Sequence, residues 1–158
     1  MENTLKVTLD PGATLPRKAH ASDIGYDLTV ASAELEFVVL PSKDYVPTDA
    51  EIAGSDGNLY GLVGVPLQDY LSRGMAALPE VQGYVDPRPR RLKVDTGVHV
   101  EPPAGYWVEV AANSRVVKLG LSMANCVGII DPDYRGSIRV FFTITDMHPE
   151  PSNLRRLL

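Results

Sequence analysis

The chain has 158 residues, a formal net charge of −5, a single cysteine and 44% hydrophobic residues. This length is enough for one domain with its own core, so we expect a single domain over residues 1–158. The negative charge argues against binding to polymeric nucleic acid, which requires a positive face to displace counterions. The sequence contains neither an export signal nor a run of about 18 apolar residues, so we expect a cytoplasmic protein with no membrane partner.

The elements expected in chain order are short strands. Thirteen glycines and thirteen prolines indicate many turns, and apolar residues alternate with polar ones from the first strand onward. The expected strands are 5–9, 24–30, 37–40, 92–100, 106–112, 119–124, 127–130 and 137–145. Short strands separated by turns at this spacing favour an all-β sandwich or jelly roll.

The segment 41–91 differs in texture from the rest of the chain. It contains a turn at 55–58 and a helical stripe of apolar residues behind Pro66. We therefore predict an insertion at about 41–91 with one short helix. The basic run Arg88, Arg90, Arg91 and Lys93, at the end of this segment and just after it, is interpreted as a solvated loop.

The segment 125–136, NCVGIIDPDYRG, carries the densest group of polar residues at a predicted hairpin. A hairpin presents backbone N–H and C=O groups to a flat ligand, and a carboxylate at its turn can orient a water molecule for attack. Asp131 is the candidate for that carboxylate. The alternative is turn chemistry alone, with the acidic side chains bonded to their own backbone.

Three segments together resemble the trimeric dUTPases, which cut dUTP to dUMP and pyrophosphate and so limit uracil incorporation into DNA. Segment 125–136 is similar to the third motif of that family, 22–28 (SDIGYDL) to the first and 113–121 (NSRVVKLGL) to the second. The resemblance runs from about residue 5 to 145 apart from the insertion. Three motifs in the order of the family are more specific than any one alone. The resemblance implies an all-β, dUTPase-like jelly roll or distorted β-barrel.

The third motif implies the roles of four residues. By resemblance, Asp131 deprotonates the water that attacks the α-phosphorus, and Tyr134 packs on the deoxyribose. Asn125 and the backbone near Gly128 would read the uracil edge. A bland alternative exists for Tyr134, which would also suit a half-buried strand position with a solvated hydroxyl.

The first and second motifs imply the phosphate side of the site. By resemblance, Ser114 donates to a phosphate oxygen and Asp27 supports the magnesium and phosphates. The arginine that usually opens the second motif is replaced by Asn113. Arg115 could substitute if the segment is a strand, because strand residues two apart share a face, and Lys118 adds a further cation. The bland alternatives are a turn for Asp27 and a short helix capped by Ser114.

The resemblance also implies a cofactor and an assembly. Mg²⁺ would be held mainly by the triphosphate and water, because this ion sheds its hydration shell reluctantly. The motifs of the family meet across subunit boundaries, so we expect a homotrimer. His20, His99 and His148 are scattered without metal-ligand spacing, and the simpler interpretation for all three is structural.

Two departures leave other functions open. Relatives continue past 154–158 with a further strand and a glycine-rich arm that closes over the nucleotide; we expect both to be absent from this sequence. Either a longer polypeptide or another segment, such as the insertion with Tyr60, Tyr70 and Arg73, would complete the site. With Asn113, this departure favours a non-catalytic trimeric nucleotide-binding or regulatory protein of the same fold. A dCTP deaminase is the other alternative, but Phe141 stands where its catalytic glutamate would lie.

Overall fold

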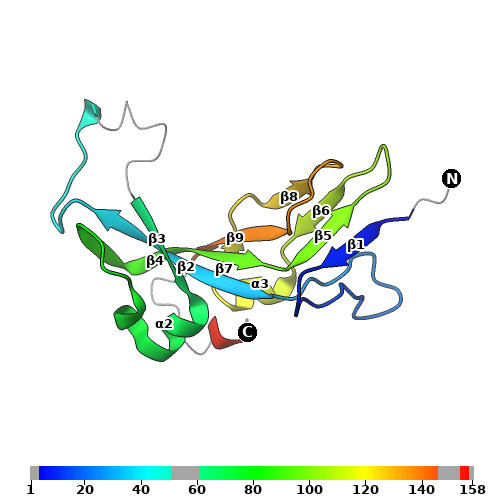
Figure 1. Ribbon diagram of the computed structural model, residues 1–158, viewed down its shortest axis with the longest axis horizontal. Helices are drawn as coiled ribbons and strands as arrows, with labels where there is room; N and C mark the ends of the chain where they lie inside the picture. Colours follow the sequence, from blue (N-terminus) through cyan, green and yellow to red (C-terminus); the bar gives the residue numbers. More distant parts are fainter. Residues whose placement is uncertain (1–3, 51–60, 146–153, 157–158) are drawn as a thin grey trace.

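The computed structural model describes residues 4–50, 61–145 and 154–156. The chain is built mainly of strands that are arranged in one large and two small antiparallel sheets (Figure 1). The elements are β1 (Lys6–Leu9), β2 (Ser32–Leu40), β3 (Gly61–Pro66), α2 (Leu67–Arg73), η1 (Gly74–Ala77), β4 (Tyr84–Asp95), β5 (Val98–Glu101), β6 (Val108–Ala111), α3 (Ser114–Lys118), β7 (Leu121–Met123), β8 (Val127–Ile130) and β9 (Arg139–Ile144).

The largest sheet has the strand order β3-β2-β4-β9-β7 and supplies much of the core. Alternation places Leu92 and Val94 of β4 inside. In β2 the alternate residues Leu35 and Phe37 belong to this core. Val38 is also buried but lies outside the core cluster, and the pairing of β2 with β4 shifts register on both sides of Phe37. The expected strand at 92–100 is divided: β4 ends at Asp95 and β5 begins at Val98.

Two small sheets stand beside the large one. The first pairs β1 with β5, and the second pairs β6 with β8 from Val108–Ile130 to Ala111–Val127. The expected hairpin between 127–130 and 137–145 is wrong, because β8 pairs with β6 whereas β9 pairs with β4 and β7. Segment 131–138 therefore crosses from one sheet to another, and its conformation depends on contacts with the rest of the chain.

The expected strand at 24–30 is also wrong. Only an isolated bridge forms there, between Arg17 and Asp27. Leu28 and Val30 pack against the core, but Ile24 is 98% exposed. Alternation of apolar and polar residues indicates which side chains could be buried together. A strand also needs a neighbouring strand to bond to, and alternation does not reveal whether one is present.

The expected short helix in the insertion is confirmed as α2, but the segment contains more than a helix. Strand β3 pairs with β2 from Glu34–Pro66 to Val39–Gly61, and Val65 and Leu67 have no exposed surface. The ring of Tyr70 lies 5.5 Å from that of Phe37, between centroids. The predicted end of the insertion at residue 91 falls inside β4. Segment 61–95 is thus continuous with the main sheet and its core.

The basic run lies on strand β4, so the solvated-loop interpretation is wrong. Arg88 and Arg90 contact the carboxylate of Asp86, with nitrogen–oxygen distances of 2.9 and 4.0 Å. Across the strands, Arg91 pairs with Glu36 at 2.7 Å and Lys93 with Glu34 at 3.0 Å. The guanidinium of Arg91 also lies 5.3 Å from the ring centre of Phe141. Acidic side chains therefore neutralise the charge of this run.

No helix in the described residues is long and apolar enough to span a membrane.

Candidate active site

The acidic turn, residues 131–136, follows β8 and exposes a free carboxylate. The backbone N–H of Tyr134 donates to the carbonyl oxygen of Asp131 at 3.1 Å, and the guanidinium of Arg135 donates to the carbonyls of Pro132 and Tyr134 at 2.7 and 3.0 Å. These bonds close the turn on itself. No described residue bonds to the Asp131 side chain, so both of its oxygens are available to solvent. The alternative expected from sequence, an acidic side chain bonded to its own turn, is therefore wrong for Asp131.

The ring of Tyr134 is held in one place within the turn. Its hydroxyl donates to the carbonyl of Ser137 at 2.9 Å, and a Cβ at Gly136 would lie 2.6 Å from the ring carbon that bears the hydroxyl. The ring therefore rests directly over the Gly136 backbone, which only glycine permits. At 37% exposure, Tyr134 still presents surface to solvent.

Asn125 and Gly128 are brought together by the tight connection between β7 and β8. A Cβ at Gly128 would lie 3.7 Å from the Asn125 amide nitrogen and 3.3 Å from the Met123 methyl group. Between them, Cys126 adopts a left-handed φ of 58°, which turns the chain sharply. The carboxamide of Asn125 thus lies beside the Gly128 backbone. This closeness would allow both groups to form hydrogen bonds to one flat ligand.

The second motif forms helix α3 rather than a strand. The side-chain oxygen of Asn113 accepts from the backbone N–H of Arg115 at 3.0 Å, so asparagine serves as the N-cap. Ser114 is the first residue of the helix, so the predicted cap lies one residue earlier. In a helix, residues two apart point about 200° away from each other. The strand argument that placed Arg115 on the face of Asn113 is therefore wrong, although Arg115 and Lys118 are both exposed.

The three motifs are not joined within this chain. Asp27 is exposed, and its backbone bonds to that of Arg17. Among the described residues, no hydrogen bond or ion pair links the acidic turn to Asp27 or to α3. The chain thus orders the groups of each motif separately.

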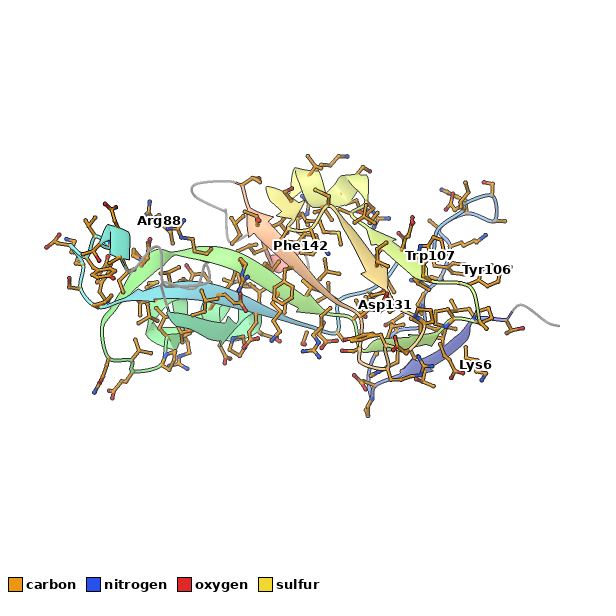
Figure 2. The ribbon with its side chains drawn as sticks, turned by 90° about the horizontal axis from the view of Figure 1, so that it is seen from above. Lys6, Arg88, Tyr106, Trp107, Asp131 and Phe142 are labelled. Atoms are coloured by element: carbon orange, nitrogen blue, oxygen red, sulfur yellow. The ribbon has the colours of Figure 1, made fainter. Side chains whose placement is uncertain are left out.

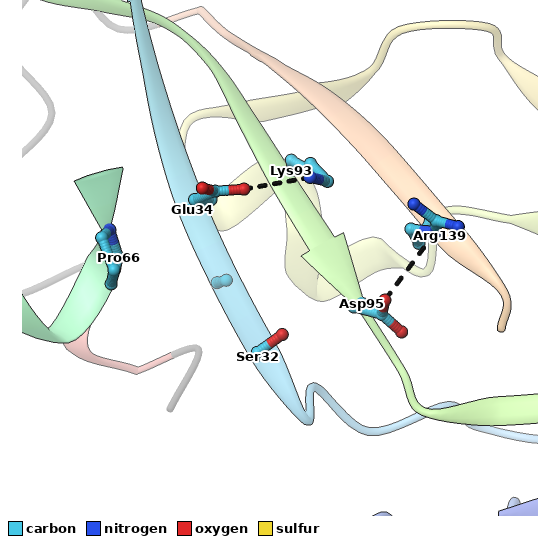
Figure 3. A pocket seen from close by; sticks show the side chains of 7 residues that line it. Ser32, Glu34, Pro66, Lys93, Asp95 and Arg139 are labelled. Atoms are coloured by element: carbon cyan, nitrogen blue, oxygen red, sulfur yellow. Dashed lines mark hydrogen bonds and ion pairs between the residues drawn. The ribbon is translucent and has the colours of Figure 1, made fainter. Parts of the chain in front are cut away.

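Two shallow cavities lie near these elements, and neither contains Asp131. One, of about 220 Å³, opens on the main sheet, where Glu34 faces Lys93 and Asp95 faces Arg139 (Figure 3). Its cations are therefore already paired. The other, of about 310 Å³, lies between α3 and β7 and includes Val117, Met123 and Cys126. Its lining is mostly apolar, so it is not a phosphate site.

No metal cage is present in the described part of the chain. Groups of three or more His, Cys, Asp or Glu side chains placed to hold an ion are absent there. A divalent ion would accordingly need ligands from a substrate or from water.

Two side chains near the acidic turn were not identified from sequence. Trp107 precedes β6, and the register that pairs Val108 with Ile130 places it opposite Asp131 (Figure 2). It is 59% exposed, so it does not lie in the core of the chain. His99 bonds to the carbonyl of Arg135, a contact that sequence spacing cannot reveal because the two lie 36 positions apart. Arg88 lies far from these side chains, toward the other end of the molecule (Figure 2).

In comparisons with known proteins, the similar chains reported below all carry the name of the same enzyme. No protein-family model matches the chain. It is 33% identical over 82 residues to a deoxyuridine 5'-triphosphate nucleotidohydrolase of Finegoldia magna, covering 48% of this chain and 56% of that protein. It is 37% identical over 90 residues to the protein of that name from Dinoroseobacter shibae, covering 51% and 58%. The chain thus spans little more than half the length of these curated relatives.

A solved structure shows the same fold. The chain is similar to a mutant dUTPase of Staphylococcus bacteriophage 80alpha that was solved with dUpNHpp, with a TM-score of 0.52 and 19% sequence identity. The similarity covers 92% of this chain and 56% of that one. The mainly antiparallel strands and this likeness confirm the expected jelly-roll fold.

Proposed function

We propose that the chain hydrolyses dUTP to dUMP and pyrophosphate, starting from the dUTPase family assignment that the sequence and fold comparisons support. The single observation that carries the proposal is the exposed carboxylate of Asp131, held on a turn that bonds to itself and leaves that side chain free. A fixed carboxylate with free oxygens can accept a proton from water as it attacks phosphorus. Asp131 is the general base for attack on the α-phosphorus.

The other groups of the third motif recognise the nucleoside. The fixed ring of Tyr134 packs against the deoxyribose and leaves no room for a 2′-hydroxyl. The Asn125 carboxamide and the Gly128 backbone bond to the uracil edge. Because the ring is already bonded to Ser137 and the Gly128 dipoles belong to the backbone, little side-chain freedom is lost on binding.

The second motif supplies the phosphate contacts. The Ser114 hydroxyl donates to a phosphate oxygen, and exposed Arg115 and Lys118 neutralise charge. Asn113 is committed to capping α3, so it does not replace an arginine clamp. An asparagine at this position forfeits a charge-assisted bond of roughly 1.5 to 3 kcal/mol.

Mg²⁺ fits this site only as part of a substrate complex. The described residues hold no ready metal cage, whereas Asp27 is an exposed carboxylate that can accept hydrogen bonds from metal-bound water. When bound, Mg²⁺ neutralises the charge that develops on the phosphates. The residues of the chain orient the nucleotide and take up the proton.

The complete site lies between copies of the chain in a homotrimer. The outer face of β6 and β8 exposes Val127 at 46% and Ile129 at 53%, next to Trp107 at 59%. The same face carries Glu109, which lies opposite Ile129 and accepts a hydrogen bond from the Trp107 ring at 3.3 Å. Exposed apolar side chains grouped around one such polar contact favour a protein interface. Pairing between copies also brings the first and second motifs of one chain to the third motif of another.

The test is an assay of pyrophosphate and dUMP released from dUTP with Mg²⁺, using the full chain. Asp131→Asn should lower turnover by about 10²-fold or more while dUTP still binds, because the amide cannot act as a base. Asp133→Asn changes an exposed acid of the same turn and should retain most of the activity. Normal turnover by Asp131→Asn would remove the assigned base, and nucleotide binding without any product would favour the non-catalytic alternative.

A further inference from the structure

His99 connects the acidic turn to the N-terminal part of the chain. It lies on β5, with Nδ1 2.9 Å from the carbonyl oxygen of Arg135 and Nε2 3.0 Å from a carboxylate oxygen of Asp10, just after β1. The ring thus bridges two segments that are distant in sequence. Its side chain is only 26% exposed, so the ring is partly shielded at this junction.

The acidic turn has few other attachments. Within 131–136, the remaining hydrogen bonds among described residues join the turn to itself or run from Tyr134 to the adjoining Ser137. His99 is therefore the one described residue outside 131–138 that forms a hydrogen bond to these six residues. Without this bond, the turn would be attached to the rest of the protein only through the end of β8 and through Ser137.

The segment just after the turn is anchored firmly by the connection between β4 and β5. The Ser137 hydroxyl donates to Asp95 at 2.9 Å, and the Ile138 backbone N–H donates to the Val98 carbonyl at 2.8 Å. The buried Thr96 hydroxyl donates to the Ile138 carbonyl at 2.9 Å. His99 extends this anchored region by one bond into the turn itself, to the residue after Tyr134.

We propose that His99 is a positioning residue that holds the acidic turn, and with it Asp131 and Tyr134, in the geometry required for hydrolysis. The inference rests on the proposed function in that the turn carries the general base. His99 does not touch the reacting atoms; it acts through the Arg135 carbonyl. A displacement of about 1 Å in a catalytic group can cost a large factor in rate, so one such bond matters.

The bridge depends on the protonation of the ring. Both acceptors are satisfied together only when Nδ1 and Nε2 each carry a hydrogen, which is the imidazolium form. The charged groups around it are Asp10, Asp95 and Arg135, and the guanidinium of Arg135 is turned back onto its own turn. The bond to the Arg135 carbonyl and then the bond to Asp10 raise the pKa of His99 above its ordinary 6.5. The bridge is therefore complete below pH 6.5 and weakens as the pH rises through the raised pKa.

The test follows the turn directly and then the reaction. In NMR spectra of the ¹⁵N-labelled chain, the His99 ring should titrate above pH 6.5, and the amide shifts of Arg135 and Gly136 should follow the same curve. Asp10→Asn keeps the ring and should lower its pKa, moving both curves to lower pH. His99→Gln should abolish the pH-dependent shifts. Lys6→Gln is the matched control, since it breaks the Lys6–Glu101 pair across the same two strands without touching the turn.

The pH profile of dUTP hydrolysis provides the second measurement. In the wild type and Lys6→Gln, kcat should fall as the pH rises through the His99 titration. His99→Gln should be at least roughly threefold slower at low pH and lack this step. Turn amides and pH profiles that are indifferent to both His99→Gln and Asp10→Asn would overturn the inference. A turn that follows His99 in a chain without hydrolysis would support the positioning role and reject the proposed function.

Discussion

At the scale of single residues, Gly136 controls where the Tyr134 ring can lie. A Cβ at position 136 would overlap the Tyr134 hydroxyl oxygen and lie 2.6 Å from the adjacent ring carbon. Gly136→Ala must therefore displace the ring and break its bond to the Ser137 carbonyl. Because we assign this ring to the deoxyribose, we expect the KM for dUTP to rise roughly tenfold, equivalent to about 1.4 kcal/mol. Steady-state kinetics with dUTP measures this change.

The control for Gly136→Ala is Gly61→Ala, where a Cβ would make an ordinary contact of 3.6 Å with Val39. Neither glycine has a left-handed φ, so alanine introduces no backbone strain at either position. The two variants therefore differ in the contact that the new Cβ makes. Gly61→Ala should keep the wild-type KM. If the ring moves in Gly136→Ala and the KM does not change, Tyr134 makes no productive contact with the sugar.

The surroundings of a side chain could be anticipated from sequence where they depend on adjacent residues, but not where they depend on the fold. Asp131 and Tyr134 stand in a contiguous turn, so their exposure could be anticipated. The role of Asn113 could not, because its side chain caps α3 only once the segment forms a helix. His99 was interpreted as structural because nothing in the sequence shows that it faces Arg135 and Asp10.

At the scale of elements, the insertion contributes to the core. Leu67 opens α2 with no exposed surface, and β3 before it forms one edge of the main sheet. Leu67→Ala leaves a cavity there and should lower the free energy of unfolding by about 2 to 5 kcal/mol. Urea denaturation measures this loss.

The exposed neighbour Gln68 provides the comparison for Leu67. Gln68→Ala should change the stability by about 0.5 kcal/mol or less. If Leu67→Ala costs no more than Gln68→Ala, segment 61–73 does not contribute to the stability of the core.

Strand positions were anticipated better than strand partners. The apolar runs that became β2, β8 and β9 are visible in the sequence, but the pairing of β8 with β6 is a long-range property. The same limit explains the error at 24–30, where alternation is present but the described residues supply no partner beyond the isolated bridge between Arg17 and Asp27. The predicted end of the insertion at residue 91 was wrong because the charged stretch around it belongs to strand β4. Its cations Arg91 and Lys93 pair with acids on β2, and only the strand pairing reveals these ion pairs.

At the scale of the whole molecule, the groups that the proposed reaction must combine come from three separately ordered motifs. Asp27 and α3 make no hydrogen bond or ion pair with the acidic turn among the described residues. The outer face of β6 and β8, which exposes Val127, Ile129 and Trp107 around Glu109, borders that turn. Both observations fit a site that is completed by a neighbouring copy, since burial of this face and assembly of the site would occur together.

Mixing two inactive variants tests this shared site directly. Asp131→Asn removes the base from one motif, and Asp27→Asn removes the carboxylate from another, so each variant alone should be strongly impaired. After co-refolding an equal mixture, roughly one site in four should receive both wild-type carboxylates from different subunits. Pyrophosphate release should then exceed the mean of the two separate variants and approach a quarter of the wild-type rate. Native mass spectrometry establishes whether mixed assemblies have formed. Mixed trimers with no gain over that mean would place Asp27 and Asp131 in a site built by one chain.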